Sequence, residues 1–281
     1  MSSLSNYITF IILTHNEEAN LDTCLRSVKS ISNQIIVVDS FSQDKTEQIC
    51  KNHNVQFYQN KFINQGIQFN WALDNIQIQT KWIMRLDADE YFTDELISEI
   101  KKIDFNSDKI KAFMMNKRIY WMNKWIKYGG IYPMKTTRLF LKNFARYEEI
   151  TEEYLVVSGK IQYINKDLVD DNKKNHIDFF TKKHLVTGEG EMREYFGLTI
   201  SGVSIEKKLL GDKSERTRWL KLNLYNKSPL FLRCICYFFY RYFFRLGFLD
   251  GKEGLIFHFL QGFWYRFYID SLIYETRKKN N

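Results

Sequence analysis

The sequence predicts an α/β protein with a mixed, mainly parallel sheet flanked by helices, followed by a helical C-terminal extension. Over the first hundred residues, short apolar runs alternate with helical patterns of about 10–15 residues, which is typical of βαβ units. The runs are apolar throughout, as in strands covered on both faces. Toward the C-terminus aromatic residues crowd together, and 17 of the 46 Phe, Trp and Tyr residues lie within positions 231–274.

The first half of the chain is organised by apolar periodicity. Asn16 is expected to cap the first helix, because Glu17 and Glu18 follow it and acidic residues favour the first turn. Leu21, Leu25 and Val28 form the apolar stripe of that helix. We expect strands at 7–13, 34–39, 55–58 and 81–86, and further helices at 44–53, 66–76 and 93–102.

The second half is less regular. Strands are expected at 111–119, 138–141 and 154–157, and mainly helices over 176–225. Ser228 and Pro229 predict a helix start, with Ser as N-cap and Pro in the first turn. Two further helices are expected, at 230–246 and 253–276.

Composition and charge narrow the possible partners. The 281 residues, 44% hydrophobic and 26% charged, suffice for a full core and exclude a disordered tail or a polytopic membrane protein. Residues 207–281 hold 15 Lys and Arg against 6 Asp and Glu, whereas the preceding residues hold 26 against 27. This asymmetry predicts a partner of negative charge, and the aromatic residues favour an anionic membrane surface over nucleic acid.

The four cysteines and the N-terminus predict a cellular location. The cysteines form no C-x-x-C pair and show no zinc-ligand spacing. The first residues lack the basic and long apolar regions of a signal peptide. We therefore expect free thiols in a reducing cytoplasm.

Acidic side chains close two of the predicted strands. Ligands of open α/β sheets bind at the carboxyl ends of the strands. Asp87 and Asp89 follow the strand at 81–86, where they could bind Mg²⁺ or Mn²⁺ together with substrate phosphates, or else form a solvated loop and helix cap. Asp39 is expected to be a second exposed acid, which either contacts a ribose or base or forms a turn.

Four blocks in order resemble family 2 glycosyltransferases of GT-A fold: FIILTHNEEANLDTCLRSV, IIVVDSFSQDKT, Gly66 with NWAL at 70–73, and WIMRLDADE. WIKYGGIYP (125–133), RLF (138–140) and LGFLDGKEG (246–254) resemble the branch that builds lipopolysaccharide core or exopolysaccharide. The resemblance implies a transferase domain over residues 1–225, with a nucleotide-binding half at about 1–105 and an acceptor half at about 106–225. Residues 226–281 form the extension.

The resemblance also implies site residues. It places the nucleotide base and ribose against Thr14, Asn16 and Glu17. Asp39 would contact the uridine, and Arg85 would lie near the diphosphate. Asp87 and Asp89 would be the D-x-D pair, with Asp89 the direct metal ligand.

The resemblance further implies a single displacement with inversion at the sugar carbon. A carboxylate must then take the proton from the acceptor hydroxyl. Glu152 ranks first for this role, because the family places its segment on the acceptor side, with Asp171 and Asp170 next. Each of the three is alternatively an exposed acid or part of a polar turn.

The expected function is transfer of a hexose from a UDP-sugar to a lipid-linked saccharide, with a divalent cation, at the inner face of the plasma membrane. Two alternatives remain open. A sugar nucleotidyltransferase has a similar sheet, but it usually has a Gly-rich loop where this chain has THNEE. A catalytically inactive membrane-bound scaffold would retain the fold without turnover.

The extension is expected to lie on the membrane rather than cross it. Arg233, Arg241 and Arg245 fall on one face of a regular helix, which predicts a cationic face with an aromatic remainder. A central arginine disfavours insertion across the bilayer. The alternative is a core hairpin packed on the sheet domain.

Overall fold

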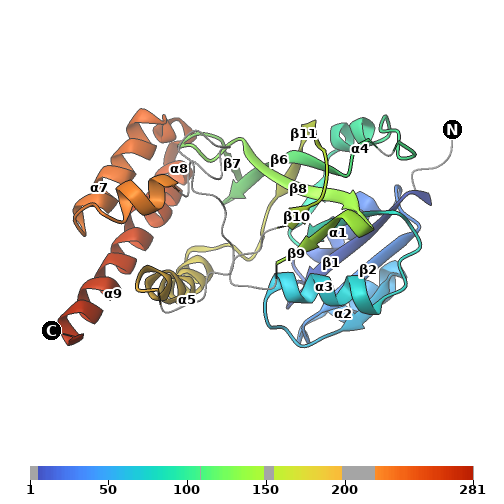
Figure 1. Cartoon of the computed structure of the whole chain (residues 1–281), viewed down its shortest axis with the longest axis horizontal. Helices are drawn as coiled ribbons and strands as arrows, with labels where there is room; N and C mark the ends of the chain where they lie inside the picture. Colours follow the sequence, from blue (N-terminus) through green and yellow to red (C-terminus); the bar gives the residue numbers. More distant parts are fainter. Residues whose placement is uncertain (1–5, 108, 149–154, 198–218, 281) are drawn as a thin grey trace. The chain divides into compact units, whose positions relative to one another are not determined.

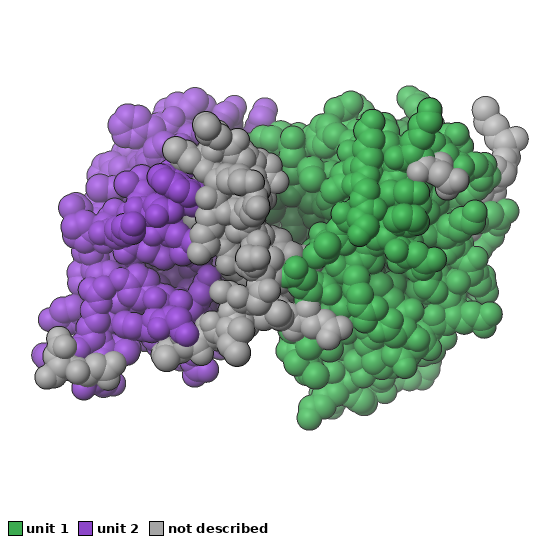
Figure 2. All heavy atoms as spheres, in the orientation of Figure 1, with its two compact units in different colours: residues 1–125, 132–174 green, residues 126–131, 175–281 purple. Residues whose placement is uncertain are grey.

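The computed structural model describes residues 6–107, 109–148, 155–197 and 219–280. The chain forms two compact units (Figures 1 and 2). Unit 1 comprises Met1–Trp125 and Tyr132–Lys174, and unit 2 comprises Ile126–Ile131 and Asn175–Asn281. Each unit has its own apolar core. The division near residue 225, implied by the resemblance, stays a prediction.

One sheet dominates unit 1. Within the described residues it has nine strands, in the order β3-β2-β1-β4-β8-β6-β11-β5, with β7 paired to β6. The first four strands in this order are mutually parallel, and β8 runs antiparallel to β4 and β6. The predicted mixed α/β sheet is confirmed. Its strands are β1 (Ile8–Thr14), β2 (Gln34–Asp39), β3 (Gln56–Gln59), β4 (Trp82–Asp87), β5 (Glu90–Phe92), β6 (Ala112–Trp121), β7 (Lys124–Ile126), β8 (Met134–Leu141) and β11 (Ile161–Asp170).

Helices cover both faces of this sheet, which explains why the central strands β1 and β2 consist almost entirely of buried, mainly apolar residues. Phe10 of β1 packs in one core cluster with Leu25 of α1. The next residue, Ile11, packs in a second cluster with Phe69 of α3. Side chains alternate between the two faces along a strand, so β1 contributes to both clusters. The helices of unit 1 are α1 (Leu21–Val28), α2 (Thr46–His53), α3 (Gln65–Asn75) and α4 (Asp94–Ile100).

A second, two-stranded sheet joins β9 (Ala145–Tyr147) to β10 (Leu155–Val157), after the 3₁₀ turn η2 (Lys142–Phe144). Asn70 of α3 fixes this sheet to the helix. Its amide donates to the carbonyl of Tyr147 at 2.7 Å and accepts the Tyr147 N–H at 3.1 Å.

Unit 2 is helical in its described part. Tyr265, Ile269 and Ile273 form its core with Met192 and Tyr195. None of the helices in the described ranges is long and apolar enough to cross a membrane. The elements are α5 (Ile177–Tyr195), η3 (Lys221–Tyr225), α7 (Leu232–Phe239), η4 (Tyr240–Phe244), η5 (Gly247–Asp250), α8 (Gly251–His258), η6 (Phe259–Trp264) and α9 (Tyr265–Asn280), of which η3, η4 and η6 are π-helical and η5 is 3₁₀.

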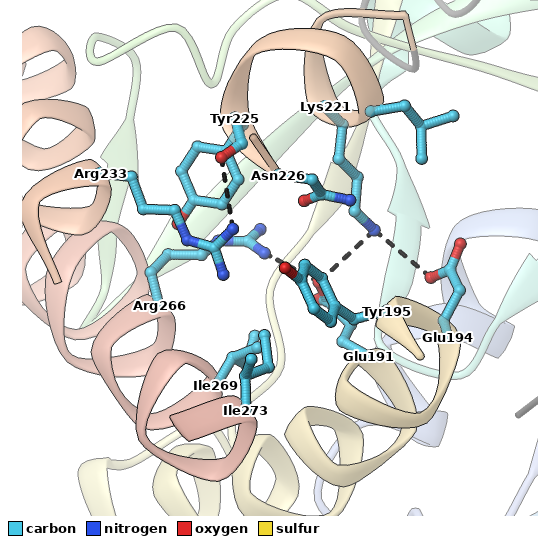
Figure 3. Close-up of a pocket in the computed structure, with 11 residues that line it drawn as sticks. Glu191, Glu194, Tyr195, Lys221, Tyr225, Asn226, Arg233, Arg266, Ile269 and Ile273 are labelled. Carbon is cyan, nitrogen blue, oxygen red and sulfur yellow. Dashed lines mark hydrogen bonds and ion pairs between the residues drawn. The ribbon is translucent and has the colours of Figure 1, made fainter. Parts of the chain in front are cut away.

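A pocket among the helices of unit 2 is lined by paired charges (Figure 3). Arg266 contacts Glu191 at 2.9 Å. Lys221 lies 3.5 Å from Glu191 and 3.4 Å from Glu194. Because these charges neutralise one another, they stabilise the packing of α5, η3 and α9. None of the predicted site residues lines this pocket.

Unit 2 holds the six-residue loop Ile126–Ile131, which leaves unit 1 after β7 and returns before β8. The Asp250 carboxylate accepts the N–H groups of Lys127 and Tyr128 at 3.1 and 2.9 Å. Gly129 has φ +67°, and a Cβ there would lie 2.0 Å from the buried ring of His258. The loop motif WIKYGGIYP and the motif LGFLDGKEG are therefore two sides of one contact.

Two predicted helix starts are wrong. Asn16 has φ +54° and lies before the helix, which begins at Leu21. Its side-chain oxygen instead accepts the Gln43 N–H at 2.8 Å. Ser228 does not cap α7, which begins at Leu232, because its hydroxyl donates to the carbonyl of Leu224 at 2.7 Å. It therefore ends the preceding helical segment.

The predicted cationic face of the extension is also wrong. Arg233 and Arg241 are 4% and 5% exposed, and only Arg245 of the three lies at the surface. The sequence places the three on one side of a regular helix, but it does not show whether that side faces inward. The buried partner of Arg233 is Asp270, 37 residues further along the chain.

Candidate active site

The predicted nucleotide residues meet at the carboxyl ends of β1 and β2. Thr14 and Asp39 are directly paired in the sheet, and the Thr14 hydroxyl donates to the Asp39 carboxylate at 2.8 Å. Asp39 also accepts the N–H of Ser42 at 2.8 Å. Asp39 is fully buried, so the prediction of an exposed acid is wrong. In this structure it fixes the turn that follows β2.

Asn16 and Glu17 belong to the same hydrogen-bonded group. The N–H of Asn16 donates to the Ser42 hydroxyl at 2.7 Å, and the N–H of Glu17 donates to Thr46 at 2.8 Å. The loops after β1 and β2 are thus joined by side chain to backbone bonds. Thr14, Asn16, Glu17 and Asp39 are brought together, as predicted from the sheet edge.

Asp87 lies at the end of β4, between two arginines. Its carboxylate oxygens contact Arg138 at 2.7 Å and Arg85 at 3.2 Å. Burial raises the pKa of Asp87, but the two guanidinium groups outweigh it and hold that pKa well below its usual range. Arg85 is itself buried and contacts the side chain of Gln65. Asp87 is therefore a charged, fixed carboxylate.

Three further charged residues complete this cluster. Glu90 is fully buried and contacts Arg138 at 2.5 Å and Lys117 at 3.4 Å. It also accepts the N–H of Asp87 at 3.0 Å. Lys117 contacts Asp170 at 2.7 Å. Buried Arg138 and half-buried Lys117 thus connect the D-x-D segment to the end of β11.

Asp89 has a different environment from Asp87. Burial raises the pKa of Asp89 well above its usual value, and the nearby Asp170 and Asp87 raise it further. Its carboxylate accepts one hydrogen bond, at 2.9 Å, from the amide of Asn172. Negative charge therefore exceeds positive charge around Asp89, and a cation at this point would lower the energy of the cluster.

The segment after β11 brings the candidate bases to the same site. The N–H of Asp171 donates to the backbone carbonyl of Asp89 at 3.0 Å. Burial raises the pKa of Asp171, and among the described residues no side chain forms a hydrogen bond or ion pair with its carboxylate. Asp170 is paired with Lys117. Glu152 lies outside the described residues.

The same segment reaches the nucleotide loop. Asn20 donates to the side chains of Glu17 at 2.8 Å and Asn172 at 3.2 Å. Lys174 contacts Glu17 at 2.5 Å. A continuous network therefore links Glu17 to Asp89 through Asn172.

Sequence reasoning missed several members of this site. Lys117 lies within β6 and Arg138 within β8, and a charged side chain inside a sheet needs a partner of opposite charge where it is buried. Glu90 follows the D-x-D segment directly. The sequence thus contained signals for these residues, but it did not show their partners. Arg138 and Glu90 are 48 residues apart, and their pairing depends on where β8 and β6 lie in the sheet.

The donor set fits a divalent cation shared with a substrate. Within the described residues, no three His, Cys, Asp or Glu side chains converge as a complete ligand set. Mg²⁺ is commonly held by one or two carboxylates, with the remaining positions filled by water and substrate phosphate. Both oxygens of Asp87 face arginines, so Asp89 is the freer ligand.

Comparisons with known proteins identify the family of this chain. The family model "Glycosyl transferase family 2" matches residues 9–173. An uncharacterized glycosyltransferase of Rickettsia prowazekii is 29% identical over 264 residues, which are 90% of this chain and 83% of that protein. One of Rickettsia bellii is 30% identical over 169 residues, 58% of this chain and 57% of that protein. The chain belongs to glycosyl transferase family 2, as the motifs predicted.

Among solved structures, the chain is similar to glucosyl-3-phosphoglycerate synthase from Mycobacterium tuberculosis, solved with Mn²⁺, UDP and glucosyl-3-phosphoglycerate. The identity is 15% and the TM-score 0.34, over 41% of this chain and 44% of that one. The matches thus span less than two thirds of this enzyme and of the Rickettsia bellii protein.

Proposed function

We propose that the chain is an inverting, metal-dependent transferase. It would move a hexose from a UDP-sugar to a lipid-linked saccharide during lipopolysaccharide or exopolysaccharide synthesis. We place the reaction at the inner face of the plasma membrane. The observation that carries the transferase proposal is the excess of negative charge around Asp89, at the carboxyl edge of the parallel strands. Thr14, Asn16, Glu17 and Asp39 border the same edge.

Asp89, assisted by Asp87, is the proposed holder of Mg²⁺ or Mn²⁺. When bound, such an ion neutralises charge on a departing diphosphate. Arg138 and Arg85 keep Asp87 ionised and fixed, so that it need not reorganise during the reaction. Arg85 contacts Asp87 of the D-x-D pair at 3.2 Å, and its place near the diphosphate is part of this proposal.

Proton removal from the acceptor hydroxyl falls to Asp171 among the described candidates. Asp170 is neutralised by Lys117, whereas Asp171 has no ion pair in the described part of the chain and has a raised pKa. A base must be deprotonated to act, so transfer should decline as the pH falls through this raised pKa. Glu152 remains the other candidate, and replacing each residue separately distinguishes them.

The first experiment measures UDP release from a panel of nucleotide sugars, with Mn²⁺ or Mg²⁺ and then with EDTA. We expect release from one donor, dependent on metal. Asp89→Asn should lower it at least about 100-fold, since interactions with developing charge contribute this much. Asp178→Asn is the control, because Asp178 is a 64% exposed acid on α5. Equal release by Asp89→Asn and wild type would contradict the proposed site.

The base is tested with a saccharide acceptor present. Asp171→Asn should lower transfer at least about 100-fold while leaving UDP binding intact. If Glu152→Gln shows that loss and Asp171→Asn does not, the assignment moves to Glu152. Thermal melting of each variant separates lost catalysis from lost folding.

A further inference from the structure

The helical stretch α7–η4 has its polarity reversed relative to an ordinary surface helix. Between Leu232 and Phe244 the charged residues are Arg233 and Arg241, and both are buried. The exposed positions carry apolar side chains, from Ile235 at 41% to Phe244 at 79% exposed. An ordinary amphipathic helix presents charges to water and apolar groups to the core. Exposure to water alone therefore does not explain why this stretch has its arginines buried and its apolar side chains exposed.

Both buried arginines are engaged inside unit 2. Arg233 donates to the Asp270 carboxylate from Nε at 2.8 Å and from a terminal nitrogen at 2.5 Å. Arg241 donates from Nε to the carbonyl of Gly129 at 3.0 Å. Removing one member of a buried ion pair is costly, so these charges cannot turn outward without loss of stability. The outward side of this stretch therefore carries neither of its two charges.

The exposed apolar positions continue past η4 into the turn η5. We call this set the outer apolar face, and its members are Leu232, Ile235, Phe239, Phe243, Phe244, Phe248 and Leu249, each 41–79% exposed. Ring contacts extend it toward η6. Phe239 stacks on Phe243 at 5.4 Å, and Phe238 meets Phe259 at 6.1 Å. Monomeric soluble proteins rarely expose large contiguous apolar patches, and such patches mark binding surfaces.

Charges at the edge of this face indicate what it binds. Arg245 and Lys252 are exposed beside it. Of the two acids in this part of the chain, Asp250 is buried against the Lys127 and Tyr128 amides, and Glu253 is partly exposed next to Lys252. Aromatic side chains with a basic rim match the boundary between headgroups and acyl chains in an anionic membrane.

We propose that the outer apolar face docks unit 2 on an anionic lipid surface. Its aromatic side chains enter the headgroup boundary, and Arg245 and Lys252 lie at the level of the phosphates. This differs from binding through a cationic helix face, because apolar burial supplies most of the affinity. The proposal adds to the proposed function by stating how the chain reaches a lipid-linked acceptor, but it is tested without transfer.

The experiment is sedimentation of the full chain with sucrose-loaded vesicles of phosphatidylethanolamine and phosphatidylglycerol. Wild type should bind, and binding should persist in 1 M NaCl, where the Debye length is about 3 Å. Phe243→Asp with Phe244→Asp should lower the partition coefficient at least about tenfold, because burying one such side chain is worth that factor. The matched control replaces Leu185 and Val186 of α5, which are 39% and 75% exposed.

Further variants and readouts keep the test decisive. Phe243→Leu with Phe244→Leu should retain most of the binding, which excludes a folding defect as the cause. UDP binding should be unchanged in all variants. Undiminished vesicle binding by the aspartate pair would overturn the proposal. So would a wild-type dimer that binds no vesicles and dissociates in the aspartate pair, because the face would then meet a second copy.

Discussion

Replacing Arg138 with Met should destabilise unit 1 far more than replacing an exposed arginine. Arg138 is 8% exposed at its side chain and contacts Asp87 at 2.7 Å and Glu90 at 2.5 Å. Met preserves much of the volume and removes the charge. Among the ion pairs of the described residues, Glu90 then keeps Lys117, at 3.4 Å, and Asp87 keeps Arg85, at 3.2 Å. The fully buried carboxylate of Glu90 and the half-buried carboxylate of Asp87 each lose their contact with a positive charge at Arg138.

The expected magnitude follows from this burial. Removing one partner of a buried ion pair costs about 3–5 kcal/mol of unfolding free energy, and Arg138 serves two partners. We expect about 4 kcal/mol, or roughly 8–16 °C in Tm. The control is Arg146→Met. Arg146 meets Asp74 at 2.6 Å, but both side chains are 51% exposed, so its loss should cost less than about 1 kcal/mol.

Urea unfolding followed by tryptophan fluorescence measures both variants, and its pH dependence identifies the cause. The pKa of Asp87 is lowered in the folded chain, so its ion pair contributes stability that is present at neutral pH and lost as the pH falls. The difference in unfolding free energy between wild type and Arg138→Met should have its full size at pH 7 and decrease below about pH 5. Equal destabilisation by the two variants, or a gap independent of pH, would refute this reasoning.

Two other predictions concern glycines and cysteines. Gly129→Ala should cost about 3 kcal/mol in thermal or urea unfolding, because its Cβ would lie 2.0 Å from the His258 ring and its φ is +67°. Gly190→Ala, in a helix with nothing within 4 Å of the added atom, should be neutral or stabilising, and the reverse order would contradict this account. Iodoacetamide at pH 8 should label the exposed Cys236 and spare Cys50, whose pKa burial raises to about 12. Peptide mass spectrometry measures the labelling of each thiol, and equal labelling of Cys236 and Cys50 would contradict this prediction.

The local sequence pattern was enough to predict the strands that are apolar on both faces of the sheet. Strand β2 has the predicted bounds, 34–39, because its apolar run ends in a polar turn. The position of Asp39 at the sheet edge was also predictable. Its burial was not, since that depends on Thr14 and Ser42 on either side of it.

The predictions that were wrong or missing depend on contacts between residues that are distant in sequence. The inward turn of Arg233 requires Asp270, and the link from Asp170 to the D-x-D segment requires Lys117. Helical periodicity places residues on a common side, but only a partner elsewhere in the chain decides whether that side is inward. The site was thus predicted at the strand ends and missed where strands from the second half join it.

The loop Ile126–Ile131 has a consequence for synthesis and for dissecting the protein. The N–H of Lys127 donates to Asp250, which lies 123 residues later in the chain. This hydrogen bond therefore cannot form until nearly the whole chain has left the ribosome. A fragment that starts after residue 174 would lack six residues of unit 2, and one that stops there would leave those six without their binding partners. Split halves of the gene product should therefore behave better when produced together than apart, since neither half contains the whole of unit 2.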